Sequence, residues 1–131
     1  MDPDELMAVA DRVLSMAGPG EELEVVVAHS RDTEVRAYDG EIEMFTSAES
    51  RGFGVRVVKD GRQGFAYAGT LDGDVLADTV GEARDNATFS TPDEFSGLVA
   101  PDGVAPAALA LFDEALVDLS PERKIELALE L

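Results

Sequence analysis

Two alternating apolar runs joined by a tight turn, between Thr46 and Gly69, constrain the fold of this chain more than any other stretch. Every second residue from Phe53 to Val57 is apolar, which is typical of a strand that buries one face. Asp60-Gly61 follows, and this pair predicts a type I′ hairpin, because both central residues of that turn need a positive φ. Phe65 and Tyr67 alternate in the same way after the turn. The stretch therefore predicts an antiparallel β-hairpin.

Small residues separate the large side chains of this hairpin, notably Gly52, Gly54, Gly64 and Ala66. A glycine inside a strand often marks a place where another backbone comes close to the sheet. The pattern predicts such an approach on one face of the hairpin.

The chain is strongly acidic, with 28 acidic and 10 basic residues and a net charge of −18. The acids are spread along the chain, which disfavours a disordered acidic tail. This surface repels a phosphate backbone, so we expect no direct contact with nucleic acid. Only Lys59 and Lys124 are lysines, and an acidic, lysine-poor chain rich in alanine and valine resembles halophilic proteins. An ordinary acidic bacterial protein is the alternative.

The halophilic interpretation predicts that salt stabilises the fold, because screening weakens the repulsion between carboxylates. We expect the thermal midpoint to rise by about 5 °C between dilute buffer and molar potassium chloride. Equal midpoints in the two solutions would contradict the halophilic interpretation.

The composition also bears on the compartment. No apolar run approaches the length of a membrane helix, and the first residues are acidic where a signal peptide is basic. The chain contains no cysteine, which excludes disulfides and thiolate metal sites. These features predict a cytoplasmic protein without a membrane partner.

Two amphipathic helices flank a run of predicted strands. Apolar spacing predicts helices over residues 3–17 and 71–88, the first capped by Asp2 and begun by Pro3. Short strands are expected at 23–28, 33–38 and 41–46, before the hairpin, with a turn at His29-Ser30-Arg31-Asp32 and another at Asp39-Gly40. This order predicts an α+β fold, in which an antiparallel meander of four to five strands packs one face against the two helices.

The remainder predicts a connection and a final helix. Pro, Gly, Ser and Asp are frequent from 88 to 103, and Ser120-Pro121 is a typical helix start. Neither glycine nor proline ends that helix before Leu131, so we expect the chain end to cut it. Residues 1–90 are thus interpreted as an N-terminal α+β domain, and 91–131 as a connecting segment leading to an absent C-terminal domain.

Catalytic chemistry has little support in these residues. His29 is the single histidine, whereas a catalytic zinc needs three protein ligands. The acidic side chains of Glu41, Glu43 and Glu49 suggest a catalytic pair of carboxylates. On a chain with 28 acidic residues, chance proximity is the better explanation. Gly52-Phe53-Gly54 lies inside a predicted strand with no helix after it, which excludes a dinucleotide fingerprint. We therefore expect no catalytic residue and no metal site in this segment.

Four stretches of the sequence carry a family resemblance: Glu49–Val57, Asp60–Ala66, Pro92–Leu98 and Leu109–Leu131. Together they resemble the N-terminal region of the TldD/PmbA family, once called modulators of DNA gyrase and now regarded as metallopeptidases. The last two stretches look more like the PmbA (TldE) branch.

The resemblance implies a role in proteolysis. In this family a TldD-type subunit carries zinc on a His-Glu-x-x-x-His motif, and a metal-free PmbA-type subunit pairs with it to cleave unfolded or leader peptides. No metal-binding position of the family falls within this chain. The resemblance therefore implies a domain that is inactive alone and has no cofactor of its own. Its implied partners are a TldD-type subunit or a second copy, together with an extended peptide substrate.

The family's signature strands supply the candidate site residues, as peptide contacts or as structural signature: Glu49, Ser50, Arg51, Gly52, Gly54, Arg56, Gly61 and Gly64. Gly52 and Gly54 leave room for a passing backbone, and Arg51 or Arg56 can hold a carboxylate. Ordinary hairpin structure is the favoured explanation of the same residues.

Two other functions remain open. One is a peptide-binding module that adds an extended strand to its sheet edge and has no part in proteolysis. The other is a regulator of DNA gyrase, whose acidic surface would contact protein.

Overall fold

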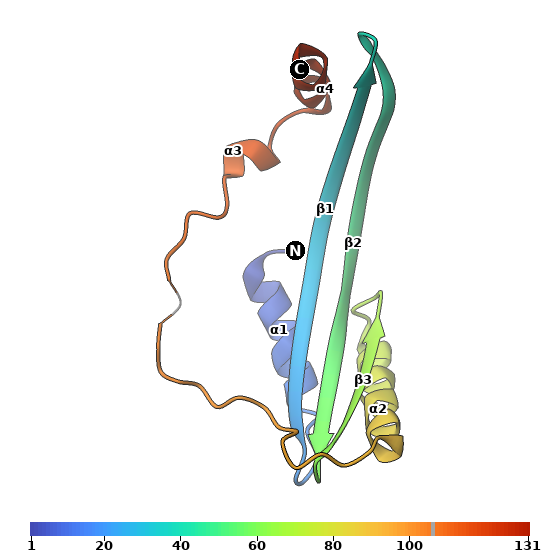
Figure 1. Cartoon of the computed structure of the whole chain (residues 1–131), viewed down its shortest axis with the longest axis vertical. Helices are drawn as coiled ribbons and strands as arrows, with labels where there is room; N and C mark the ends of the chain where they lie inside the picture. Colours follow the sequence, from blue (N-terminus) through green and yellow to red (C-terminus); the bar gives the residue numbers. More distant parts are fainter. Residues whose placement is uncertain (106) are drawn as a thin grey trace. The chain divides into compact units, whose positions relative to one another are not determined.

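The computed structural model describes residues 1–105 and 107–131 (Figure 1). The chain divides into two compact units, residues 1–30 with 50–100 and residues 31–49 with 101–131. The elements in chain order are α1 (Pro3–Leu14), β1 (Glu22–Tyr38), β2 (Glu41–Lys59), β3 (Arg62–Ala68), α2 (Gly73–Phe89), α3 (Glu114–Val117) and α4 (Pro121–Glu130).

The strands form one sheet in the order β1-β2-β3. β2 and β3 pair antiparallel, from Phe53 opposite Ala68 to Lys59 opposite Arg62. The turn between them has φ of 50° at Asp60 and 71° at Gly61, so both central residues have the positive φ that a type I′ turn needs. The predicted hairpin is confirmed.

The expected meander of four to five strands is not confirmed, because the described residues form a sheet of three strands. The residues from His29 to Asp32 continue β1, and the residues after Thr46 continue β2. In both stretches every non-glycine residue has negative φ, and no proline interrupts the pairing. The hydroxyl oxygens of Ser30 and Ser50 lie 2.9 Å apart, where the expected turn would have separated the strands. Predicted pairs of short strands are therefore single strands of 17 and 19 residues.

Both long helices contribute to the core on one face of the sheet. β2 contributes Phe53, Val55 and Val57, and the fully buried Val13 of α1 and Val80 of α2 belong to the same cluster. α2 packs along β3 (Figure 1). Burial of these side chains is the main driving force for the unit. The α+β class, the antiparallel hairpin and the two helices are confirmed.

The helix starts follow the sequence closely. The Asp2 carboxylate accepts the Glu5 backbone N–H at 2.8 Å, and the Glu5 side chain accepts the Asp2 N–H at 3.0 Å. This reciprocal capping box satisfies two amides that the helix itself leaves unpaired. In the second unit, Ser120 accepts the Arg123 N–H at the start of α4.

Among the described residues, no helix has the length and hydrophobicity needed to cross a membrane.

Candidate functional site

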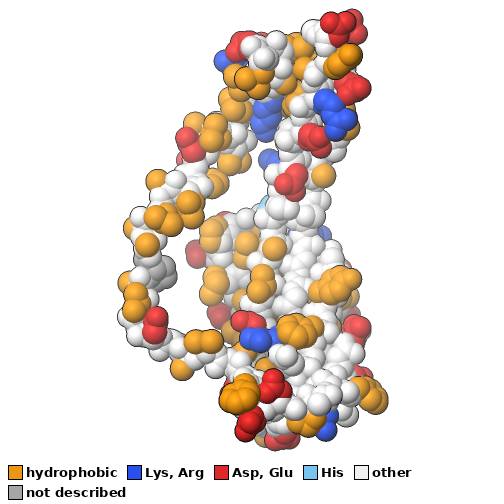
Figure 2. Space-filling model, in the orientation of Figure 1, with side chains coloured by type: hydrophobic (Ala, Val, Ile, Leu, Met, Phe, Trp, Pro, Cys, Tyr) orange, Lys and Arg blue, Asp and Glu red, His pale blue; other side chains and the backbone are white. Residues whose placement is uncertain are grey.

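The sheet face opposite the helices leaves large apolar side chains in solvent. Val26, Phe65 and Tyr67 are 66%, 58% and 86% exposed, although they lie in the middle of strands. Glu24, Gly54 and Arg56 have the same strand parity, and these six residues line one shallow hollow, which we call the open face. In Figure 2, hydrophobic side chains lie beside basic and acidic ones over the lower ends of the strands. Exposed apolar side chains gathered in this way are typical of an interaction surface.

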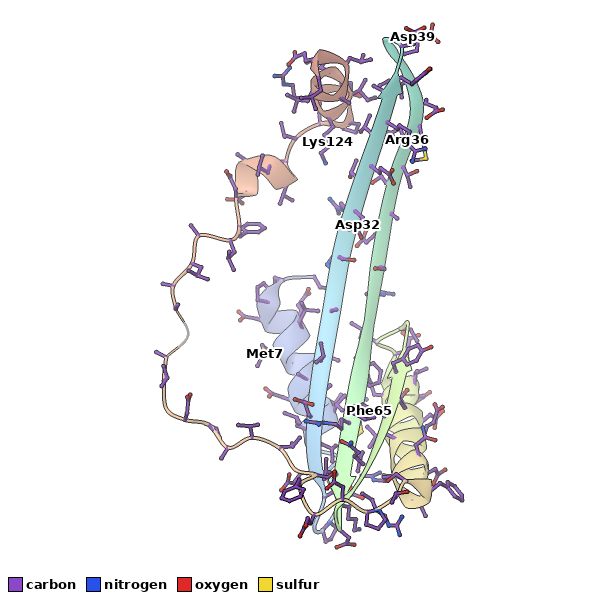
Figure 3. The ribbon with its side chains drawn as sticks, viewed as in Figure 1. Met7, Asp32, Arg36, Asp39, Phe65 and Lys124 are labelled. Carbon is purple, nitrogen blue, oxygen red and sulfur yellow. The ribbon has the colours of Figure 1, made fainter. Side chains whose placement is uncertain are left out.

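Arg56 lies at the centre of the open face. Its Nε is 2.8 Å from Glu24 Oε2, and its guanidinium carbon is 5.9 Å from the ring centre of Phe65, the residue opposite it in the sheet. In Figure 3, Phe65 lies over the lower part of the sheet. Arg56 Nε is buried and makes no hydrogen bond within the described residues, so the Glu24 contact is an ion pair without hydrogen-bond geometry. The charge is held over the aromatic ring, where a cation–π contact stabilises it.

The segment after α2 crosses one end of the sheet. Asp93 donates its backbone N–H to the Gly61 carbonyl at 2.8 Å, and Leu98 donates its N–H to Glu22 at 2.9 Å. Ser90 Oγ accepts the Gln63 N–H at 3.1 Å. The hydrogen bonds thus run from β3 to β1 and hold residues 90–98 across the end of the strands.

A second backbone approaches the sheet at Gly64, as the glycine pattern predicts. A Cβ at this position would lie 2.2 Å from the Ala83 carbonyl oxygen and 2.2 Å from the Ala87 nitrogen. The approaching backbone is that of α2, on the face away from the open face. At Gly54 the nearest atoms to such a Cβ are 3.8 Å and 3.9 Å away, which is ordinary contact.

An ion pair between a buried carboxylate and a half-buried arginine joins the loop before β1 to α2. Glu21 is 7% exposed, and its two carboxylate oxygens each lie 3.0 Å from Arg84 Nε, which donates to them. Arg84 Nη2 donates to Glu21 and to the Met16 carbonyl. The Arg84 hydrogen bonds lower the pKa of Glu21, with help from the Gly18 N–H and from the charges of Arg84 and Lys59, while burial works in the opposite direction.

Comparison with known families identifies the sheet and its main helix. Residues 23–87, from β1 to the last turn of α2, match the family described as PmbA/TldA metallopeptidase domain 1. The chain belongs to the TldD/PmbA family. The match includes every residue of the open face and Gly64.

Three similar proteins come from different microorganisms. An uncharacterised protein of Methanocaldococcus jannaschii is 33% identical over 76 residues, which are 58% of this chain and 17% of that protein. A crystal structure described as a modulator of a DNA gyrase from Thermotoga maritima superposes with a TM-score of 0.76 at 21% identity, covering 95% of this chain and 28% of the other. TldE from Thermococcus kodakarensis gives 0.65 at 23% identity, covering 91% and 25%. At these identities the two structures show a shared fold, and this chain spans about a quarter of their length.

The signature residues of the TldD/PmbA resemblance do not form one cluster. Gly54 and Arg56 lie on the open face, Gly52 has the same parity, and Arg51 is exposed on β2. Gly64 lies under α2, Gly61 is in the hairpin turn, and Ser50 contacts Ser30. Glu49 lies in the second unit, 3.9 Å from Arg31.

Sequence reasoning missed several residues of this domain. Val26, Phe65 and Tyr67 carried no usable signal, because strand alternation separates two faces without indicating which of them a helix covers, and on β3 the structure buries Gly64 and Ala66 instead. Glu21 and Arg84 carried none, since they lie 63 positions apart and meet only in the folded unit.

A zinc ion does not fit the residues described for this domain. No three His, Cys, Asp or Glu side chains of residues 1–105 and 107–131 come close enough together to hold a metal. His29 Nδ1 lies 3.3 Å from the N-terminal nitrogen of Met1. We therefore derive no metal-dependent step within this chain.

Proposed function

We propose that this chain is the N-terminal domain of a TldD/PmbA-type metallopeptidase system, from the metal-free PmbA-like subunit. The match of residues 23–87 to the family's first domain carries the proposal. The stretches Pro92–Leu98 and Leu109–Leu131, which resemble the PmbA branch, support the choice of subunit. Zinc and catalysis belong to a TldD-type partner in the cytoplasm, and this domain is inactive alone.

Its contribution to proteolysis is to hold an extended peptide on the open face. Apolar side chains of the peptide pack on Val26, Phe65 and Tyr67. The exposed apolar surface of these three residues is then removed from contact with water, which favours binding. Gly54 offers no side chain above the strand, which allows a backbone to pass close to it. The net charge of −18 favours a cationic peptide over an acidic one.

A binding experiment with matched variants tests this function. We expect a fluorescently labelled, unstructured cationic peptide to bind the 131-residue chain, and Tyr67→Ser to weaken binding about tenfold, because aromatic anchors carry much of the energy of an interface. Phe89→Ser is the control, since Phe89 is 87% exposed on α2, away from the open face. Fluorescence anisotropy measures both affinities.

The same preparations test the absence of catalysis. The chain alone should leave casein intact with zinc present, and cleavage should require the full-length protein and a TldD-type partner. Chelator-sensitive cleavage by the chain alone, surviving repurification, would contradict the inactive domain.

The binding experiment has its own contradicting outcome. An equal loss of peptide affinity in Tyr67→Ser and Phe89→Ser would contradict peptide binding on the open face.

A second candidate is an interaction module without a proteolytic role, acting on DNA gyrase. The structure from Thermotoga maritima is described as a gyrase modulator, which favours this candidate. The acidic surface would then contact protein, since it repels the phosphates of DNA. A supercoiling assay with added chain distinguishes this candidate, because a peptide-binding domain leaves gyrase unchanged.

A further inference from the structure

A hollow outside the open face gathers an unusual share of the positive charge. It lies where β2 turns into β3, beside the last turns of α2, and has a volume of about 410 Å³. Three of the chain's 10 basic residues line it, Lys59, Arg62 and Arg84, against two of its 28 acidic residues, Glu21 and Asp60. One unit of positive charge is left in a hollow of a protein whose net charge is −18. Such a local field concentrates small anions.

The hydrogen bonds of the three cations show which of them remain available. Arg84 directs its Nε and Nη2 at Glu21, so this pair is mutually satisfied. Arg62 uses Nη1 to donate to the Ser90 carbonyl at the end of α2. Within the described residues its Nε and Nη2 groups have no acceptor, and this edge of a guanidinium presents two parallel N–H groups.

Lys59 completes the available donors. It stands directly opposite Arg62 across the hairpin, and its side chain is 45% exposed. Its ammonium nitrogen lies 4.0 Å from Glu21 Oε1, which is an ion pair beyond hydrogen-bond length. The buried side chains of Val57 and Ala87 provide an apolar floor. A guanidinium edge, an ammonium and an apolar floor match a carboxylate with a short hydrocarbon body.

We propose that this hollow binds a carboxylate monoanion, with Arg62 holding the two oxygens and Lys59 adding charge. A single negative charge balances the one left in the hollow, whereas the overall charge of the protein repels polyanions. The carboxylate comes either from a small organic acid or from the carboxyl terminus of a peptide. The second source rests on the peptide-binding function proposed above, and the first does not.

Titration of the whole chain at constant ionic strength tests the proposal, followed by amide chemical shifts. The probes are acetate, propionate and N-acetyl-dialanine, with N-acetyl-dialanine amide as the neutral control. We expect the free acids to shift the amides of residues 59–62 and 84–88, and the amide control to leave them in place. Preference for the dipeptide identifies a peptide terminus, and equal affinity with propionate identifies a free acid.

Variants separate the pocket from general charge effects. Lys59→Gln should weaken carboxylate binding about fivefold, and Arg62→Lys about tenfold, because lysine keeps the charge and loses the paired N–H groups. Lys124→Gln removes the same charge on α4 and should leave the affinity unchanged. Binding of the amide as strong as that of the acid, an equal effect of Lys124→Gln and Lys59→Gln, or no shifts at all would overturn the proposal.

Discussion

Gly64→Ala is expected to destabilise the domain by about 3 kcal/mol, which lowers the thermal midpoint by about 10 to 20 °C. The added methyl group would meet the backbone of α2 at 2.2 Å on both the Ala83 oxygen and the Ala87 nitrogen. Backbone atoms inside a helix cannot move aside as the end of a flexible side chain can. The helix must shift away from β3. Its residues Leu76 and Ala83, which are buried in the core, then lose contacts with the core. Chemical denaturation and calorimetry measure the loss.

Gly54→Ala is the matched control on the neighbouring strand. Its added methyl group has its nearest contacts at 3.8 Å and 3.9 Å, and alanine loses less backbone entropy on folding than glycine. We expect a change within about 0.5 kcal/mol of the original protein. A Gly64→Ala variant as stable as Gly54→Ala would contradict the close approach of α2.

Arg84→Met is expected to cost about 2 kcal/mol at pH 7, because it leaves the buried Glu21 carboxylate with only the Gly18 N–H and the ammonium of Lys59 at 4.0 Å. This value is below that of a fully buried pair, since Arg84 itself is 36% exposed. Adding Glu21→Gln should recover part of the loss, because the uncompensated charge is then removed. Arg36→Met is the control, as its pairs with Glu34 and Glu43 are exposed and contribute little.

The pH dependence of this loss follows from the lowered pKa of Glu21. A carboxyl group whose pKa is lower in the folded state stabilises the fold fully above its unfolded pKa, near 4.5. That contribution disappears as the pH falls through the lower, folded pKa. The difference between the original protein and Arg84→Met should therefore be largest at pH 7 and shrink below pH 4.5. Unfolding curves that differ equally at pH 7 and pH 3 would show that Arg84 acts through packing alone.

Local chemistry in the sequence was enough for the elements with strong signals at short range. Asp60-Gly61 and Asp39-Gly40 predicted both tight turns, since few other pairs accept two positive φ values in succession. Asp2 and Ser120 predicted both helix starts, because a cap needs only a side-chain oxygen and an amide three residues on. The family resemblance also rested on this hairpin, and the match over residues 23–87 confirms it.

Other features were decided by contacts between distant residues. The sequence alone broke β1 near His29, whereas pairing with β2 keeps it extended to Tyr38. A polar stretch does not bend when the neighbouring strand satisfies its backbone groups. Contacts between residues that are distant in sequence also formed the candidate sites. Arg56 meets Glu24 and Phe65 through strand register, and Arg84 meets Glu21 across 63 positions of sequence.

The sequence by itself determined the two hairpin turns, the first and last helix caps and the two-residue alternation of the strands, because each depends on neighbours within a few positions. Tertiary structure alone decided that α2 lies against Gly64, that Phe65 and Tyr67 stay in solvent, and that Lys59 and Arg62 share a hollow with Arg84. Strand alternation indicates which residues share a face of the sheet. The position of the helix decides which of the two faces is covered. That position depends on how the whole apolar stripe of α2 fits the sheet, which no short stretch of sequence contains.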